Sequence, residues 1–263
     1  MRWIRYNRAG KASFGILAGE QVEEVKGSPF GDHARTGDRF PLESIRLLVP
    51  VIPPTFYAAG LNYAAHIRAV AAAQGVEPKI PAKPDIGYRA ANALIAHEEP
   101  IVIPQDAGDK IHYEAELVVV IGKQAKHLSE IDALSCVFGY TIGNDVSERD
   151  WQAEDRTLWR AKNTDTWKPM GPWIETDLDL GRALTTVKVN GNTTIEFHTN
   201  DMLFGVATYI SAMTRYLTLY PGDVIWMGTD GASPNMKPGD VCEIGISGIG
   251  VLRNRFEAQR SSR

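Results

Sequence analysis

The chain has 263 residues, of which 44% are hydrophobic and 23% charged, so it can bury a sizeable core in one large or two modest domains. Its 28 Lys and Arg against 32 Asp and Glu give a formal net charge of −4, and the absence of long like-charge blocks argues against nucleic-acid and membrane partners. Two cysteines, Cys136 and Cys242, stand in apolar runs. We therefore expect a soluble, unexported protein of the reduced cytoplasm, without disulfides, whose partners are small molecules or proteins.

The first fifty residues are expected to form a small β subdomain. Alternating apolar residues over 2–6 and again over 14–17, with a turn between them, predict a hairpin-like pair of strands. A polar, Gly- and Asp-rich stretch covers 27–38, and the apolar segment after it ends at Pro53 and Pro54. The prolines mark a domain boundary. The predicted domains are a small N-terminal subdomain (1–50) and a main domain (51–263).

The main domain is expected to be mostly β, with a few helices. The Ala-rich segment 64–74 predicts a helix that stops at Gly75, and the prolines after it make this helix and its tail a candidate mobile flap. A second helix is expected over 201–216, capped by Asn200 or Asp201, and Ser129 is expected to cap a short helix. Strands are expected over 117–122, 139–145, 224–226, 241–246 and 251–252, with a hairpin at Asn190-Gly191. Because regular βαβ alternation is missing, the fold class is α+β and β-rich rather than doubly wound.

Two glutamates stand where a buried strand begins. Glu114 and Glu116 occupy positions i and i+2 in YEAELVVV, at the change from polar to wholly apolar residues. Side chains alternate along a strand, so both carboxylates lie on one face, and beside the core they need a cation or a basic group to neutralise them. Oxygen ligands of this kind suit Mg²⁺, Mn²⁺ or Ca²⁺. The alternative is a solvent-facing strand entry with two surface acids.

A third acid, Asp145, follows the apolar strand over 139–144. Three carboxylates leave open metal positions for water and substrate, as a Lewis-acid site requires. The alternative is that Asn144 and Asp145 form an ordinary turn.

Four segments, in this order, resemble the successive motifs of the fumarylacetoacetate hydrolase superfamily. They are YEAELVVVIGK (113–123), GYTIGNDVSERDWQ (139–152), KNTDTWKPMGPWI (162–174) and PGDVIWMGTDGAS (221–233). The resemblance covers nearly the whole chain and implies a mixed β-roll core, usually in a homodimer. It also implies one Mg²⁺ or Mn²⁺ held by Glu114, Glu116 and Asp145, where chelation of a 2-oxo acid stabilises its enolate.

The same resemblance assigns residues that contact the substrate. Lys162 is expected to place a cation beside the chelate, although in isolation it would be taken for a solvated surface lysine. Arg89 suits bidentate contact with a distal substrate carboxylate, with simple packing at the base of the flap as the alternative for Tyr88 and Arg89. The expected substrate-binding residues are Tyr88, Arg89, Gln152, Thr166 and Thr229. Thr229 lies in G-T-D-G where the family often has G-T-P, so a different turn is expected.

The expected general base is His66 in the flap, which matches the family histidine that activates water or moves a proton. Many hydrolases and decarboxylases of the family carry a glutamate three residues later, whereas this chain has Ala69. A second departure is His112, which stands where an aspartate is common and is either a support for the site or exposed.

Three functional hypotheses follow. The favoured one is a metal-dependent hydrolase that cleaves a C–C bond in an acylpyruvate or related 2,4-dioxo acid. The second is a decarboxylase of oxaloacetate type or an isomerase or dehydratase of 2-hydroxy-dienoates, in aromatic or sugar-acid catabolism. Ala69 favours isomerisation or dehydration within that group. The third is a non-catalytic protein that binds a metal and an oxo acid.

Overall fold

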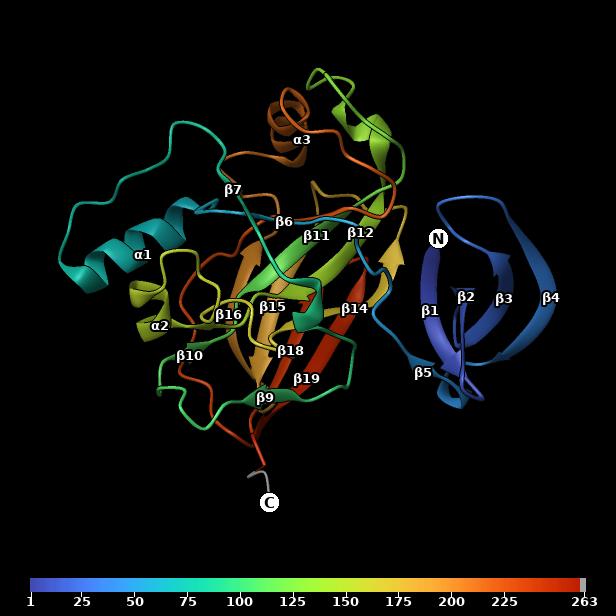
Figure 1. Ribbon diagram of the computed structural model, residues 1–263, viewed down its shortest axis with the longest axis horizontal. Coiled ribbons are helices and arrows are strands. Elements are labelled where there is room, and N and C mark those ends of the chain that lie inside the picture. The colour runs from blue at the N-terminus through green and yellow to red at the C-terminus, as the bar shows by residue number, and fades with distance from the viewer. Residues whose placement is uncertain (261–263) are drawn as a thin grey trace.

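The computed structural model describes residues 1–260 of the chain. Strands dominate and are both parallel and antiparallel, so the predicted β-rich α+β fold is confirmed (Figure 1). The twelve-stranded sheet contains β1 (Arg2–Arg8), β2 (Lys11–Ala18), β3 (Gln21–Gly27), β4 (His33–Pro41), β5 (Arg46–Leu47), β6 (Phe56–Ala59), β7 (Ile86–Tyr88), β8 (Leu94–Ile95), β11 (Ala115–Ile121), β12 (Val137–Asn144), β14 (Lys168–Glu175) and β17 (Val224–Trp226).

Two smaller sheets and three helices complete the described fold. The five-stranded sheet contains β9 (Ile101–Ile103), β15 (Leu184–Val189), β16 (Asn192–His198), β18 (Val241–Ile246) and β19 (Gly250–Ala258). The two-stranded sheet pairs β10 (Ile111–His112) with β13 (Ser147–Glu148). The helices are α1 (Ala64–Gln74), α2 (Arg149–Glu154) and α3 (Val206–Thr214). None of the helices within residues 1–260 is long and apolar enough to cross a membrane.

The N-terminal strands form a meander that extends the large sheet. The predicted pair of strands is β1 and β2, and β3 and β4 continue the meander. The polar stretch 27–38 contributes most of β4, whose side chains are mainly exposed, because an edge strand can take polar residues on both faces. Arg2 of β1 pairs with Glu175 of β14. The meander is thus a distinct lobe in Figure 1 but is hydrogen-bonded to the main sheet.

Strand β11 is buried on both faces and fixes the position of the acids. Leu117, Val119 and Ile121 pack into the core that the five-stranded sheet shares. Val118 and Val120 pack on the opposite face, in the cluster that contains Trp226. A strand covered on both faces carries an unbroken apolar run. Polar side chains are therefore confined to its N-terminal end.

Helix α1 has the predicted bounds, and it ends because Gly75 adopts a left-handed conformation with φ of 66°. Helix α3 begins later than predicted, after Gly205 rather than Asn200 or Asp201. The reason is tertiary: Met202 bridges Tyr63, and the Leu203 N–H donates to the carbonyl of Asn62 at 2.7 Å. The short helix expected after Ser129 is reduced to a 3₁₀ turn over Ala133–Cys136.

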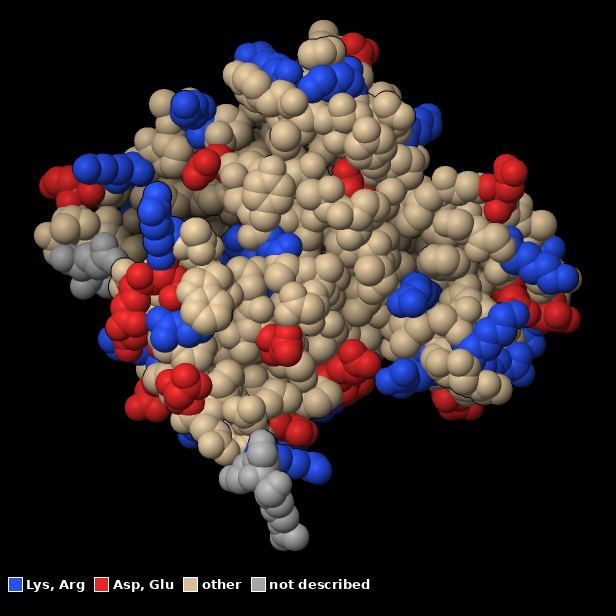
Figure 2. Space-filling view, in the orientation of Figure 1, with Lys and Arg blue, Asp and Glu red and all other residues tan. Residues whose placement is uncertain are grey.

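The hairpin between β15 and β16 is confirmed. Asn190 and Gly191 have φ of 52° and 79°, which is the pair of left-handed conformations that a two-residue hairpin turn requires. On the face of the molecule in Figure 2, Lys and Arg side chains are interspersed with Asp and Glu side chains rather than gathered in one field.

Candidate active site

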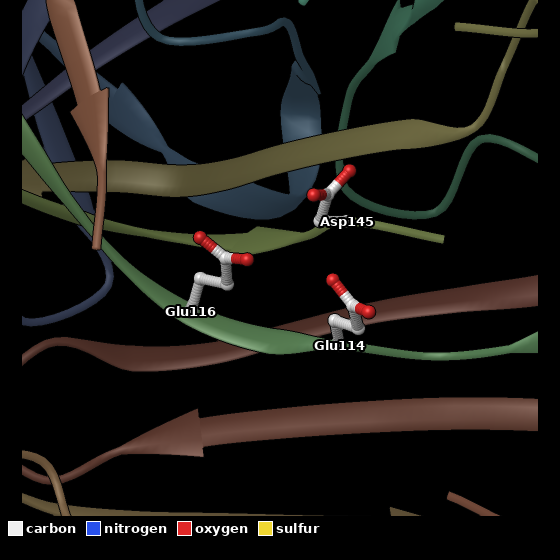
Figure 3. Close-up of side chains that lie close together, drawn as sticks. All are labelled: Glu114, Glu116 and Asp145. Atoms are coloured by element: carbon white, nitrogen blue, oxygen red, sulfur yellow. The ribbon is translucent and has the colours of Figure 1, made fainter. Parts of the chain in front are cut away.

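Three buried carboxylates converge at the N-terminal end of β11. Glu114 directly precedes β11 and Glu116 lies within it, while Asp145 directly follows β12 (Figure 3). Strands β11 and β12 pair with Ala115 opposite Asn144, and the Asp145 N–H donates to the Glu114 carbonyl at 2.9 Å. One carboxylate oxygen from each residue lies within 4.8 Å of the others. The arrangement can hold one metal ion.

Four cationic side chains surround two of these carboxylates. Lys162 Nζ lies 2.6 Å from Glu114 Oε2 and 3.0 Å from Asp145 Oδ2. Asp145 also pairs with Arg89 and Lys168 at 2.8 Å each, and Glu114 pairs with Arg149 at 2.7 Å. Ion pairs at these separations hold the partners in their charged forms.

The pKa values of the two paired acids reflect this arrangement. Burial alone would raise the pKa of Glu114, but Lys162 and Arg149 outweigh it and lower that pKa to about 2. Burial is likewise outweighed at Asp145, where Arg89 and Lys162 hold the pKa well below its usual range. Both carboxylates are therefore ionised at neutral pH.

Glu116 has a different environment. Its Oε2 accepts the Gly228 N–H at 2.9 Å, and no Lys or Arg within residues 1–260 forms an ion pair with it. Burial and the neighbouring carboxylates Asp145 and Glu114 raise its pKa to about 8. Among the three acids, Glu116 is therefore the one whose negative charge no Lys or Arg side chain within residues 1–260 neutralises by direct contact. Three oxygen donors, one of them lacking a counter-charge, fit a hard divalent cation.

Lys168 belongs to the same cluster, although it was not among the residues predicted from the sequence. The side chain is fully buried, and Nζ donates to the carbonyls of Val146 and Trp167 as well as contacting Asp145. Burial lowers its pKa to about 8, against the opposing effect of Asp145. The available signal in the sequence was a single lysine at the start of the mostly apolar run that forms β14 (Lys168–Glu175).

His66 lies in the first turns of α1 and approaches the loop after β17. Its Nδ1 is 2.5 Å from the carbonyl oxygen of Gly231. The Gly228–Gly231 turn therefore connects His66 at one end with Glu116 at the other. Ala69, one turn further along α1, is exposed. Figure 2 shows the surface hollowed beside α1, with Lys and Arg side chains on the borders of the hollow.

His112 supports the site rather than facing open solvent. Its Nδ1 accepts a hydrogen bond from Arg149 Nε at 3.0 Å, and its Nε2 lies 3.0 Å from Asn235 Oδ1. Burial and the Arg149 cation lower the pKa of His112, and His66 is near enough to contribute in the same direction. Arg149 thus bridges His112 and Glu114, contacting His112 through Nε and Glu114 through Nη1.

The residues expected to contact substrate are dispersed. Gln152, on α2, accepts from Arg149 at 2.7 Å, which places it beside the cluster. Thr229 lies in the turn between Glu116 and His66. Tyr88 is 57% exposed and packs its ring on Tyr57. Thr166 accepts the Val102 N–H at 2.8 Å, and among the described residues it has no contact with the three carboxylates.

Two known family models together match most of the chain. Residues 55–257 match the model of the fumarylacetoacetate (FAA) hydrolase C-terminal domain. The chain belongs to the fumarylacetoacetate hydrolase family. Residues 1–50 match a second family model, the N-terminal domain of Rv2993c-like proteins. The resemblance drawn from the four sequence motifs is therefore confirmed.

Individual members of the family are similar over most of their length. Protein Rv2993c of Mycobacterium tuberculosis is 39% identical over 89% of this chain and 86% of its own. The 2,4-didehydro-3-deoxy-L-rhamnonate hydrolase of a Sphingomonas species is 37% identical over 77% of this chain and 73% of its own. The structure of 5-carboxymethyl-2-hydroxymuconate delta-isomerase from Mycobacterium smegmatis is 35% identical, with a TM-score of 0.89, and covers 98% of this chain and 100% of that one.

Proposed function

We propose that this member of the fumarylacetoacetate hydrolase family is a divalent-metal-dependent enzyme that hydrolyses a C–C bond in an acylpyruvate or related 2,4-dioxo acid. The observation that carries the proposal is the cluster of Glu114, Glu116 and Asp145 within 4.8 Å, with Lys162 bridging two of them. Mg²⁺ or Mn²⁺ fits three carboxylate oxygens, with Ca²⁺ as a further possibility.

The charge of the site supports an anionic substrate. The site contains four side-chain cations, Lys162, Lys168, Arg89 and Arg149, against three carboxylates, two of which they contact. The side-chain cations thus outnumber the carboxylates by one, and a bound divalent cation would increase this excess of positive charge. A 2-oxo acid, which develops a second negative charge in the reaction, would offset it. When bound, the metal supplies Lewis-acid polarisation of the 2-oxo group.

The side chains have complementary roles in hydrolysis. A backbone carbonyl only accepts hydrogen bonds, so His66 donates from Nδ1 to Gly231, and its Nε2 keeps a lone pair that can take a proton from water. The hydroxide equivalent adds to the acyl carbon. The electrons of the breaking C–C bond then pass to the pyruvate fragment, which takes up a proton, and the acyl fragment leaves as a carboxylic acid. Lys162, held against Glu114 at 2.6 Å, would provide a fixed positive charge for the substrate oxygen that becomes negative.

A second candidate is isomerisation of a 2-hydroxy-dienoate. The observation that favours it is the absence of a carboxylate at Ala69, which removes a group that helps a histidine activate water. Moving a proton between two carbons of a substrate needs a base but no water. The structural relative from Mycobacterium smegmatis is named as a delta-isomerase.

A substrate panel distinguishes the two candidates. We expect the metal-loaded protein to release pyruvate from an acylpyruvate, and EDTA to abolish this release. Consumption of a hydroxydienoate or of oxaloacetate, without pyruvate release from any acylpyruvate, would replace the hydrolase proposal by the second hypothesis. Failure to turn over any 2-oxo acid more than once would favour the binding-protein hypothesis.

The setting of the enzyme is part of the proposal. Cys136 and Cys242 are both buried and unbridged, as we expect of a cytoplasmic protein. A homodimer is the prediction from the family resemblance. Light scattering should then give about twice the chain mass of 29.0 kDa, and a mass equal to one chain would contradict it.

A further inference from the structure

The orientation of His66 rests on a backbone group. Its Nδ1 donates to the Gly231 carbonyl at 2.5 Å, and within residues 1–260 this is the contact that orients the ring. Ala69 cannot bond to the ring and is exposed. A histidine that acts as a base must have its tautomer fixed by the partner of the nitrogen that does not react. In this chain the Gly231 carbonyl performs that task.

The turn that carries this carbonyl is fixed by side chains. Asp230 Oδ1 accepts the Gly231 N–H at 2.7 Å, and the Gly228 N–H donates to Glu116 at 2.9 Å. Asn62, just before α1, donates to the Met227 carbonyl at 2.9 Å. The turn is therefore tied both to the acidic cluster and to the residues that precede the flap helix.

Gly231 itself tolerates little change. Its φ is +74°, and a Cβ atom would lie 1.7 Å from Ile195 Cδ1. A left-handed glycine has wide conformational freedom of its own, so it helps if the peptide plane that precedes it is held. A hydrogen bond to the Gly231 N–H holds that plane, from which the φ and ψ torsions of Gly231 lead to its carbonyl. The acceptor of this hydrogen bond is the Asp230 carboxylate.

We propose that Asp230 is a positioning residue for the general base. By holding the Gly231 N–H it restricts the turn from which the Gly231 carbonyl reaches His66 Nδ1. That carbonyl fixes the Nδ1–H tautomer and leaves Nε2 free to accept a proton. Asp230 thereby takes over the orienting role that a carboxylate at position 69 would have, with a neutral acceptor in contact with the ring. The inference rests on the proposed role of His66 in catalysis, but its structural part can be tested without turnover.

The test compares three aspartate variants. Asp230→Ala removes the acceptor, whereas Asp230→Asn keeps an oxygen at the same position. Asp179→Ala is the matched control, because Asp179 Oδ1 also accepts a glycine N–H, that of Gly181 at 3.0 Å, in an exposed turn away from the acidic cluster. Long-range ¹H–¹⁵N spectra of the metal-free protein report the tautomer, with the His66 signals assigned through His66→Gln.

We expect His66 to hold the Nδ1–H tautomer in the wild type, in Asp230→Asn and in Asp179→Ala, and to become a tautomer mixture in Asp230→Ala. On a substrate that the wild type turns over, kcat should fall roughly 10-fold in Asp230→Ala, with KM changed by less than about 2-fold. Asp230→Asn should recover most of this loss.

The outcomes separate the two proposals. A folded Asp230→Ala protein that keeps the wild-type tautomer overturns the positioning role of Asp230. If Asp230→Ala does not fold, Asp230→Glu, which displaces the carboxylate by one methylene, replaces it in the test. A folded Asp230→Glu protein that keeps the wild-type tautomer then overturns the positioning role. A tautomer mixture in Asp230→Ala, together with a wild type that turns over no 2-oxo acid, would support the positioning role and reject the proposed function.

Discussion

Replacing Glu116 by glutamine should stabilise the metal-free protein while destroying its metal site. Burial and two neighbouring carboxylates raise the pKa of Glu116 from 4.5 to about 8. An acid with a raised pKa in the folded state favours folding below pH 4.5, and this contribution is lost as the pH rises to about 8. At about 1.4 kcal/mol for each pH unit above 4.5, the loss amounts to about 3 kcal/mol by pH 7.

Glutamine keeps an oxygen that can accept the Gly228 N–H but cannot ionise, so Glu116→Gln removes this pH dependence. Urea unfolding in EDTA at pH 5, 7 and 8 should show the variant gaining stability over the wild type as the pH rises, by about 3 kcal/mol at pH 7. Exposed Glu257 provides the control, because Glu257→Gln should change the unfolding free energy by less than about 0.5 kcal/mol. Parallel profiles for Glu116→Gln and the wild type would refute the reasoning.

The other predictions concern the metal and the buried lysines. Mg²⁺ or Mn²⁺ binding should release close to one proton from Glu116, and the metal affinity should increase as the pH rises to about 8. Calorimetry in two buffers measures the number of protons released, and a metal affinity independent of pH would contradict the prediction. At saturating metal, Lys162→Met should lower kcat by about 10²-fold, because the site loses the fixed cation that contacts Glu114. An unchanged kcat would exclude a role for Lys162 in stabilising the negative charge that develops on the substrate. Lys168→Met should lower the unfolding free energy by about 3 kcal/mol, because Asp145 and two buried carbonyls lose a donor. Denaturant unfolding tests this change, and a loss below about 1 kcal/mol would show that the buried lysine is dispensable.

Local patterns predicted the elements whose ends are set by local chemistry. Helix α1 ends at Gly75 because glycine accepts the left-handed cap, and Asn190-Gly191 turns the hairpin for the same conformational reason. Helix α3 begins late because Leu203 is hydrogen-bonded to Asn62, far away in the sequence. Such a contact leaves no periodic trace in residues 201–205.

The acidic cluster was accessible to sequence reasoning, whereas its electrostatic surroundings were not. Glu114 and Glu116 share a face because side chains alternate along β11, and Asp145 ends the strand that pairs with it. The roles of Arg149 and Lys168 depend on how α2 and β14 pack against that pair. The turn at Asp230 departs from the usual motif, and its contact with His66 becomes visible in the fold.

The most direct test of the account is Mn²⁺ binding followed by electron paramagnetic resonance. We predict one bound Mn²⁺ per chain in the wild type and in Glu257→Gln, displaced by excess Mg²⁺, and loss of the bound signal in Glu114→Ala because one of three converging carboxylates is gone. Unchanged Mn²⁺ binding and turnover in Glu114→Ala would contradict the assignment of the metal site.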